Sequence, residues 1–263
     1  MNVLGSVVGV VRLTVFLLHV LIGLLLTFLF FRFMRWGLRQ NFIRGWSRIL
    51  LRVLGVRVNV ARAPVQLPMR GLLVSNHSSW LDIFVTNAIQ PTRFIAKSEI
   101  KKWPLLGALV SSAGTLYVER GNRHMISKTN KEISQAASNG ELIGLYAEGT
   151  TTDGTYVLPF KSNLFQPAIE SALHIYPVGV SYSKDGRHSQ VASYAGDTSL
   201  LGSFWLLASN IGLTANVHFC PIIPAAQYTQ RQELAKATQE AVARALGQDV
   251  MSAETYEQMQ RGV

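Results

Sequence analysis

Apolar and polar positions are arranged in two different ways along the chain, and the change occurs near residue 70. Beyond it, short apolar runs rich in β-branched and aromatic residues predict strands at 71–76, 92–97, 114–120, 141–147, 175–182 and 217–223. The stretches between them predict helices at 79–89, 105–112, 125–138, 164–172, 199–209 and 231–246. Strands that alternate with helices in this way predict an α/β domain with a mostly parallel central sheet flanked by helices.

The N-terminal part instead begins with a long apolar stretch. Residues 13–31 contain His19 as their only strongly polar side chain, and residues 3–11 extend the apolar character upstream of Arg12. About twenty such residues reach across the hydrocarbon of a bilayer, so a membrane-associated helical segment is expected. A cleaved signal peptide is disfavoured because the run is too long and no small-residue cleavage site follows it. Two arrangements remain open, either one membrane span or two shorter helices, broken near Gly23, that enter one leaflet.

Arginines with helical spacing follow the apolar stretch. They form two sets, each on one helical face: Arg32, Arg35 and Arg39, then Arg44, Arg48 and Arg52. With the aromatic residues between them, they predict an interfacial helix or helix pair whose arginines point toward lipid headgroups. The alternative is a bundle helix with a solvated charged face. We therefore divide the chain into a membrane anchor with basic interfacial helices at residues 1–62 and a larger domain at 63–263, with a linker at 61–70.

The formal net charge of +10 is concentrated in the same N-terminal part. Residues 1–81 contain ten arginines, no lysine and no acidic residue, whereas residues 82–263 contain fifteen basic and fifteen acidic residues. The arginines follow an apolar stretch and no nucleic-acid-binding motif accompanies them, so membrane lipid is the expected partner and nucleic acid is not. By the positive-inside rule the larger domain faces the cytoplasm, which indicates the cytoplasmic face of a bacterial inner membrane.

A histidine and a carboxylate, His77 and Asp82, follow the first predicted strand. On a continuous helix, five residues turn by roughly 500°, so the two side chains would point about 140° apart. The pair must therefore straddle the start of a helix, and Ser79 as N-cap with Asp82 three residues later fits such a start. Asp82 would then hold one ring nitrogen of His77 and leave the other free to act as a general base. The alternative is a surface turn before a capped helix.

Three further blocks follow in order: Gly-Thr-Leu-Tyr-Val-Glu-Arg at 114–120, Leu-Tyr-Ala-Glu-Gly-Thr-Thr at 145–151 and Ile-Tyr-Pro-Val-Gly-Val at 175–180. With the histidine block they resemble the glycerolipid (1-acylglycerol-3-phosphate-type) acyltransferase family, including its lyso-ornithine lipid and lysophospholipid branch. The resemblance covers about residues 70–182. It implies an enzyme that moves a fatty acyl group from acyl-CoA or acyl carrier protein to the free hydroxyl of a lysolipid, with His77 as base and Asp82 as its partner.

The resemblance also implies where the acceptor lipid binds. The expected binding residues are Lys97, Arg120, Glu148, Gly149, Thr150, Thr151 and Lys161. The cations among them suit an anionic headgroup. Thr151 departs from the family pattern, because members that use lysophosphatidic acid usually carry arginine at this position. Lysophosphatidic acid, a lysophospholipid with a larger headgroup and lyso-ornithine lipid therefore all remain open as acceptors.

No cofactor and no metal are expected for this chemistry. A base that activates the lipid hydroxyl permits direct transfer, so Ser75, Ser78 and Ser79 are expected to be cap and turn residues. The other five histidines are scattered and form no ligand-spaced pair, and the single Cys220 lies in an apolar run typical of a buried strand. The alternatives are a catalytically inactive lipid-binding or scaffold protein of the same fold, and a lipid hydrolase, which the lack of a Gly-x-Ser-x-Gly motif makes remote.

Overall fold

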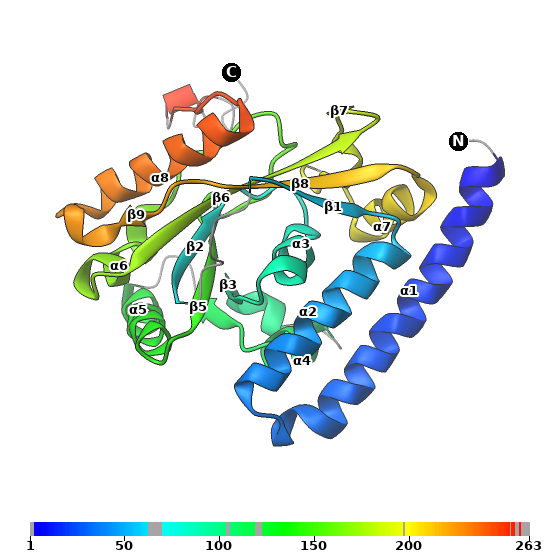
Figure 1. Ribbon diagram of the computed structural model, residues 1–263, viewed down its shortest axis with the longest axis horizontal. Coiled ribbons are helices and arrows are strands. Elements are labelled where there is room, and N and C mark those ends of the chain that lie inside the picture. Colours follow the sequence, from blue (N-terminus) through cyan, green and yellow to red (C-terminus); the bar gives the residue numbers. More distant parts are fainter. Residues whose placement is uncertain are drawn as a thin grey trace.

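The computed structural model describes residues 3–62, 70–103, 106–118, 123–196, 198–252, 254, 255 and 258. Within this part of the chain, one sheet contains nine strands in the order β1-β8-β6-β2-β5-β3-β4, with β7 and β9 also paired to β6 (Figure 1). The strands are β1 (Arg57–Arg62), β2 (Gly71–Ser75), β3 (Arg93–Lys97), β4 (Leu116–Val118), β5 (Leu142–Tyr146), β6 (His174–Lys184), β7 (Arg187–His188), β8 (Leu213–Phe219) and β9 (Ile223–Pro224).

The centre of the sheet is parallel, as the alternation of elements predicts. Strand β2 pairs in parallel with both β5 and β6, and β3 pairs in parallel with β5 and β4. Strand β8 is antiparallel to β6, and β1 is parallel to β8 at the edge. The carboxyl ends of β2, β5, β3 and β4 therefore lie along the same side of the sheet, where sites of α/β proteins form.

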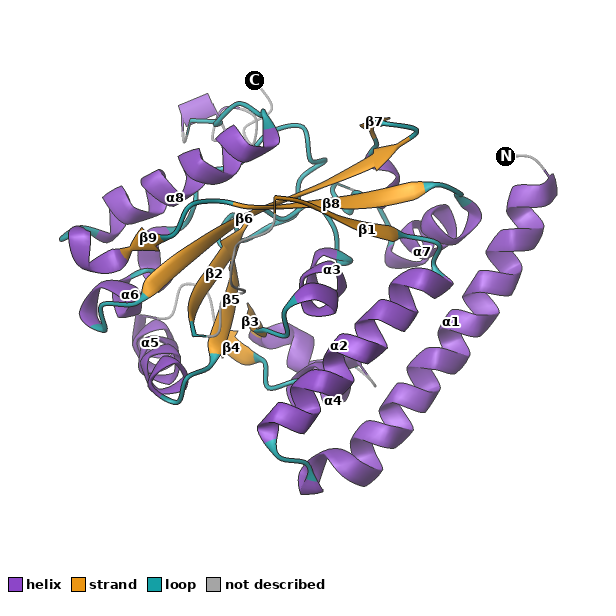
Figure 2. Cartoon of the chain, in the orientation of Figure 1, coloured by secondary structure: helices purple, strands orange, loops and turns teal. Residues whose placement is uncertain are grey.

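Helices cover both faces of this sheet (Figure 2). They are α1 (Val3–Phe30), α2 (Trp36–Val53), α3 (Asp82–Ile89), α4 (Leu106–Ser112), α5 (Arg123–Ser138), α6 (Gln166–Glu170), α7 (Leu200–Ser209) and α8 (Arg231–Leu246). Leu72 and Val74 pack into a core shared with α5, α6 and α8, whereas Leu73 packs into a second core with α2, α3 and α7. Successive strand residues point to opposite faces, so β2 is buried on both sides.

The predicted elements need four corrections. The strand expected at 217–223 is instead β8 at Leu213–Phe219, followed after a break by β9 at Ile223–Pro224, and Cys220 lies half-buried between them rather than within a buried strand. Helix α3 begins at Asp82 rather than at Ser79, because the backbone first makes a turn in which Asp82 N donates to Ser79 O. The predicted linker overlaps a strand, since Ala61 and Arg62 belong to β1; residues 63–69 lie outside the described part of the chain. The helix expected at 164–172 is shorter, because a 3-10 turn at Ser162–Leu164 precedes α6. Strand β1 also means that the central sheet includes residues before position 63.

The apolar N-terminal segment forms one continuous helix, α1, with no break at Gly23. Among the described residues it is the helix long and apolar enough to cross a membrane, by length and composition. Its buried residues are mostly small or polar: Gly5, Gly9, Phe16, Gly23 and Thr27. Its exposed residues are large and apolar, among them Val7, Leu17, Leu21, Leu25 and Phe28. This is the reverse of a helix on a water-soluble protein, and it is typical of a helix that faces lipid.

Two arginines of the second set, Arg44 and Arg48, contact the following domain rather than pointing to headgroups as the spacing predicts, whereas Arg52 is exposed. Arg48 Nε donates to Ala88 O at 2.8 Å, and Arg44 Nη2 donates to Gln90 Oε1 at 3.4 Å. Both acceptors lie at the carboxyl end of α3, where the helix has carbonyls without an intrahelical partner and a negative dipole end. These two arginines therefore attach α2 to the domain that follows, whereas Arg32 and Arg35 are exposed.

Candidate active site

The candidate site lies at the carboxyl ends of two neighbouring parallel strands. β2 ends at Ser75 and leads to His77, while β5 ends at Tyr146 and leads to Glu148. Because Ser75 and Tyr146 are paired in register, the two following segments leave the sheet side by side. The structure thus confirms that His77 and Glu148 come together beyond the ends of these two strands, as the strand assignments predict.

His77 and Asp82 are in contact across the start of α3. His77 Nδ1 lies 2.9 Å from Asp82 Oδ2. The same oxygen accepts hydrogen bonds from the backbone N–H groups of Ser78 and Ser79, each at 2.9 Å. The Asp82 side chain is fully buried, and its other oxygen, Oδ1, accepts from Tyr182 Oη at 2.6 Å. Four donors therefore converge on the Asp82 carboxylate. A carboxylate can accept all four, because its two oxygens are acceptors with several lone pairs.

The imidazole ring of His77 is fixed by stacking as well as by this hydrogen bond. It stacks on Tyr146 with ring centroids 4.1 Å apart, and Tyr146 stacks in turn on Phe94 with centroids 5.2 Å apart. Since Asp82 accepts at Nδ1, the Nδ1–H tautomer is assigned and Nε2 carries the lone pair. The ring is therefore held at Nδ1 and on one face, and the His77 side chain is still 18% exposed.

The phenols of Tyr146 and Tyr182 stay protonated beside this pair. Burial, reinforced by the charge of Asp82, raises the pKa of each phenol well above its usual range. Tyr182 therefore acts as a hydrogen-bond donor to Asp82, and Tyr146 supplies a neutral aromatic face to His77.

Glu148 is buried and braces the site through the backbone. Its Oε2 accepts from His77 N at 2.6 Å, and its Oε1 accepts from Leu158 N at 2.8 Å. Burial raises the pKa of Glu148 to about 8, against the opposing effect of these two backbone hydrogen bonds. With both oxygens bonded to amides, Glu148 ties the turn that carries His77 to the loop after β5. Its contact with the acceptor stays a prediction.

The loop after Glu148 folds back over the His77 turn. Gly149 adopts a positive φ of 72°, a conformation that glycine takes at little cost, and this turns the chain away from β5. Thr152 N then donates to His77 O at 2.9 Å. The Thr151 hydroxyl donates to Tyr194 O, and Thr150 is half-buried. The structure therefore brings Gly149, Thr150 and Thr151 beside His77 and Asp82.

The three cations predicted for the acceptor are placed differently. Lys161 is exposed, and its backbone N donates to Ala147 O at 2.8 Å. Because Ala147 directly precedes Glu148, this bond places Lys161 close to Glu148. Lys97 is exposed at the carboxyl end of β3, two strands from β2 in the sheet order. Arg120 lies outside the described residues. The assignment of all three to the acceptor stays a prediction.

Sequence reasoning missed two residues that organise the site. Tyr182 belongs to β6 and holds Asp82, as described above. The Asn76 side chain bridges both backbone groups of Val180, with Nδ2 donating to Val180 O at 2.9 Å and Oδ1 accepting from Val180 N at 2.8 Å. Alternation along β6 could have placed Tyr182 on the same buried face as Val178 and Val180, but it gives no signal that Asp82 is its partner.

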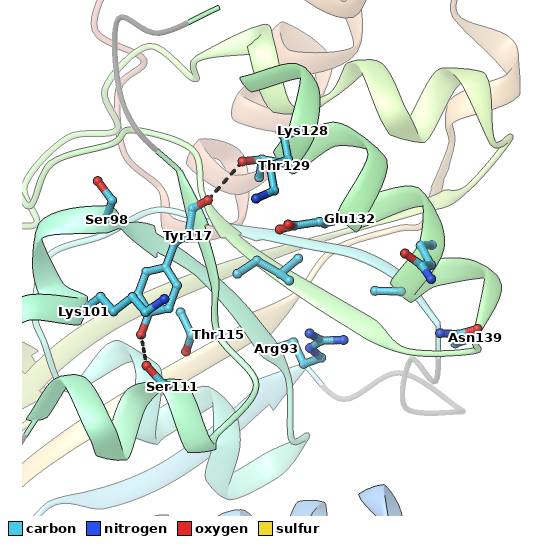
Figure 3. Close-up of a pocket in the computed structure, with 13 residues that line it drawn as sticks. Arg93, Ser98, Lys101, Ser111, Thr115, Tyr117, Lys128, Thr129, Glu132 and Asn139 are labelled. Carbon is cyan, nitrogen blue, oxygen red and sulfur yellow. Dashed lines mark hydrogen bonds between the residues drawn. The ribbon is translucent and has the colours of Figure 1, made fainter. Parts of the chain in front are cut away.

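A separate pocket of about 620 Å³ lies along the edge of the sheet beside β4 and α5 (Figure 3). Tyr117 stands in its wall, where the phenol contacts Ser111 Oγ at 2.7 Å and Lys101 Nζ lies 5.7 Å from the ring. Lys128 and Arg93 also line it, and Arg93 is paired with Glu141. His77 and Asp82 are not among its lining residues, so the pocket is distinct from the His77–Asp82 pair.

Comparisons with known proteins agree with this site. The sequence model of the Acyltransferase family matches residues 57–181, which include β1, the His77 turn and the Glu148 loop. A 1-acyl-sn-glycerol-3-phosphate acyltransferase of Neisseria meningitidis serogroup B is 34% identical over 212 residues, which cover 80% of this chain and 83% of that protein. A lyso-ornithine lipid O-acyltransferase of Pseudomonas aeruginosa is 34% identical over 209 residues, which cover 80% of each chain.

Among solved structures, the 1-acyl-sn-glycerophosphate acyltransferase PlsC from Thermotoga maritima superposes with a TM-score of 0.66. The alignment covers 92% of this chain and 94% of that one at 18% identity, so it shows a shared fold. Fold, site and relatives together define an acyltransferase that acts on lysolipids. The chain belongs to the 1-acylglycerol-3-phosphate acyltransferase family.

Proposed function

We propose that the protein transfers a fatty acyl group from acyl-CoA or acyl carrier protein to the free hydroxyl of a lysolipid, with His77 as the general base and Asp82 as the residue that orients it. The observation that carries the proposal is the 2.9 Å contact between His77 Nδ1 and Asp82 Oδ2, which engages one ring nitrogen and leaves Nε2 as the base of a side chain that is 18% exposed. The acceptor is lysophosphatidic acid, a lysophospholipid or lyso-ornithine lipid, and the thioester is a co-substrate rather than a cofactor.

The reaction begins when the lipid hydroxyl gives its proton to His77 Nε2 as its oxygen attacks the thioester carbonyl. Asp82 stabilises the imidazolium that forms. The tetrahedral intermediate then collapses, the carbon–sulfur bond breaks, and the proton returns from Nε2 to the leaving thiolate. The products are an ester and a free thiol, so one acyl group has moved and no other reactant is consumed.

The oxyanion of the intermediate needs hydrogen-bond donors placed in advance. Most amides around His77 are already bonded: His77 N to Glu148, Ser78 N and Ser79 N to Asp82, and Thr152 N to His77 O. In the part of the chain that the structure describes, the Thr150 and Thr151 amides have no such internal acceptor. They are therefore our proposed oxyanion donors.

Burial of the nearby serines supports direct transfer. Ser75, Ser78 and Ser79 are at most 2% exposed, so none can reach a substrate carbonyl without a rearrangement of the turn. Cys220 directly follows β8 and is half-buried, and its Sγ donates to Ala241 O at 3.4 Å. A covalent acyl-enzyme is not part of the proposal.

The relatives and Thr151 bear on the identity of the acceptor lipid. Relatives named for both 1-acyl-sn-glycerol-3-phosphate and lyso-ornithine lipid have similar identity to this chain. Thr151 places a neutral hydroxyl, bonded to Tyr194 O, where an arginine would clamp a bare phosphomonoester. This favours an acceptor with a larger headgroup, such as a lysophospholipid or lyso-ornithine lipid.

The contacts of α1 support a position within one leaflet at the membrane surface. The helix packs on α7 near Gly9 and on α2 near Gly23, where Trp46 fills the space a Cβ would occupy. A transverse span would draw both of these helices, with their polar residues, into the hydrocarbon, which is costly. We place α1 along the membrane surface with its large apolar residues in lipid, and the arginines favour the cytoplasmic face of a bacterial inner membrane.

The test is incubation of the purified protein with labelled acyl-CoA or acyl carrier protein and a panel of lysolipids, read by mass spectrometry. The expected product is a diacyl lipid that retains the label, formed with one donor and a subset of acceptors. His77→Ala, purified in parallel, is the matched control. Lipid binding without turnover for every donor and acceptor would favour a catalytically inactive lipid carrier instead.

A further inference from the structure

Trp80 connects the catalytic turn to α7. It stands between His77 and Asp82 in the sequence, yet its side chain points away from them. Its Nε1 donates to Ser203 Oγ at 3.0 Å, and its ring meets Phe204 edge-on with centroids 4.8 Å apart. Phe16 of α1 lies 5.1 Å from Phe204 and 6.4 Å from Trp80 between ring centroids. One aromatic cluster thus joins the proton-transfer turn to two helices of the molecule.

Helix α7 is fixed against α1. A Cβ at Gly9 would lie 3.2 Å from both Ser209 and Trp205, so the two helices approach as closely as glycine allows. Arg12 Nη1, on the next turn of α1, donates to Ala208 O at 3.1 Å and also to Asn210 O. The guanidinium thereby satisfies carbonyls at the carboxyl end of α7, where a positive charge is favourable. Any surface that α1 enters must therefore also meet α7, which lies beside it in Figure 1.

The exposed large side chains of α7 and of the turn after it are apolar. Leu201 is 80% exposed, Leu206 38% and Ile211 49%. The described residues after position 53 include six exposed large hydrophobic residues, and these three lie within eleven residues of one another. No ionisable residue occurs between 199 and 213. Val10 and Val11, which flank the contact on α1, are also exposed, so the apolar surface continues from one helix to the other.

We infer that α7 and the turn that follows it form a second membrane-inserting element, in which Leu201, Leu206 and Ile211 enter the acyl boundary of a lipid bilayer beside α1. Exposed apolar area of this kind marks a membrane or protein interface, and continuity with the lipid-facing side of α1 selects the membrane. Through Ser203 and Phe204, the inserted helix holds Trp80, and with it the His77 turn, at the lipid surface. The inference rests on the membrane placement of α1 given under the proposed function.

Depth measurement tests the insertion directly in the full chain. Single cysteines replace Leu201, Val7 of α1, or Ile222 in a Cys220→Ala background, and each carries an environment-sensitive fluorophore. Ile222 is the matched control, because it is 53% exposed and precedes β9 at the end of the sheet away from α7 (Figure 1). The vesicles contain phosphatidylethanolamine and phosphatidylglycerol with a spin label on the acyl chain. We expect quenching at positions 201 and 7 and none at 222.

The outcomes distinguish insertion of α7 from membrane placement of α1. Quenching at 7 with none at 201 overturns the inference about α7 and leaves the placement of α1 intact. No quenching at either position contradicts the membrane placement itself. Protection of the 201 label from aqueous iodide without acyl-chain quenching means that a second copy or another protein covers α7, which also overturns the inference.

Activity gives an independent readout. In Leu201→Gln/Ile211→Gln, the KM for a long-chain lysolipid in vesicles should rise about tenfold or more, because burial of one large apolar side chain shifts an equilibrium by at least that factor. Turnover of a water-soluble short-chain lysolipid should not change. Ile222→Gln should alter neither assay. An equal loss with both acceptors would show a structural role for these residues and overturn the inference.

Discussion

The phenol of Tyr182 donates a 2.6 Å hydrogen bond to Oδ1 of Asp82, while the other carboxylate oxygen holds His77. Tyr182 comes from the central strand β6, which fixes its position relative to the start of α3. The bond has two consequences. It sets the plane of the Asp82 carboxylate, and it withdraws some negative charge from the oxygen that faces His77. Tyr182 therefore acts as a positioning residue through Asp82.

Tyr182→Phe should lower kcat by about tenfold with little change in KM, since a hydrogen bond to a charged group contributes on the order of 1.5–3 kcal/mol. The freed carboxylate becomes a stronger acceptor for His77, so the acid limb of the pH–rate profile should move to higher pH. Steady-state kinetics between pH 5 and 10 checks both effects. Tyr228→Phe, a substitution on the α8 side of the sheet, serves as control. A lower kcat with an unmoved profile would mean that Tyr182 only supports packing.

His77→Ala should reduce kcat by roughly two to four orders of magnitude, because it removes the proposed general base. The thermal midpoint should change little, because the side chain is partly exposed. Asp82→Asn should also impair kcat rather than KM, through loss of ring orientation and of imidazolium stabilisation. Activity with near-saturating donor and acceptor, together with circular dichroism, checks both. Exposed His174→Ala should behave like wild type. Near-normal turnover in a folded His77→Ala protein would exclude the mechanism.

Glu148 should make stability depend on pH. Burial raises its pKa from the usual 4.5 to about 8, so folding favours the protonated form. Its stability contribution is then complete below pH 4.5 and is lost as the pH rises through 8. In Glu148→Gln, the thermal midpoint should depend less on pH over this interval. The variant should also be less stable than wild type at low pH, because the NH2 group of the glutamine side chain would face one of the two backbone N–H donors. Thermal unfolding of both proteins at pH 4.5, 6, 7.5 and 9 measures the difference. Parallel pH curves would contradict the assignment.

Gly23 should be required for the contact between α1 and α2. A Cβ at this position would lie 2.5 Å from Trp46 Nε1, and Trp46 also stacks on His19 with centroids 4.7 Å apart. Gly23→Val should therefore separate the helices and lower the thermal midpoint in detergent by several degrees. Gly37→Ala is the matched control, because nothing lies within 4 Å of its Cβ and alanine stabilises a helix by roughly 0.5–1 kcal/mol. Equal midpoints for the two variants would show that α1 does not depend on this contact.

The sequence predicts local features of the site better than distant ones. His77 and Asp82 were predictable as a pair because five residues and a cap residue limit the geometry they can adopt. Tyr182 was not, because it comes 100 residues after Asp82 and a tyrosine in an apolar strand has no distinguishing pattern. The orientation of Arg44 and Arg48 was also missed, because helical spacing shows a shared face and not which neighbour covers it.

Strand β1 illustrates a different limit. In Arg57–Arg62, Val58 and Val60 alternate with polar residues, which is the pattern of a strand at the edge of a sheet. The basic residues were instead grouped with the arginine-rich helices, because charge and proximity in sequence suggested one segment. Only its parallel pairing with β8, more than 150 positions later, shows that the segment belongs to the sheet.

Thr151→Arg should shift acceptor preference toward lysophosphatidic acid. Thr151 lies in the loop that folds over His77, and its hydroxyl donates to Tyr194 O, so no cation occupies this position. A guanidinium can make a charge-assisted, bidentate contact with a phosphomonoester, which corresponds to roughly 1–3 kcal/mol in relative kcat/KM. The same charge should disfavour acceptors that place an amine or quaternary ammonium nearby.

Competition between lysophosphatidic acid and lysophosphatidylethanolamine in mixed vesicles, for wild type and mutant, measures this shift as a product ratio. Thr155→Arg is the matched control, because it adds the same charge at an exposed position four residues further along the loop. We expect the ratio to rise about tenfold or more for Thr151→Arg and to stay near the wild-type value for Thr155→Arg. An unchanged ratio with preserved activity would mean that residue 151 does not face the headgroup, and Thr151 would then carry no information about the acceptor.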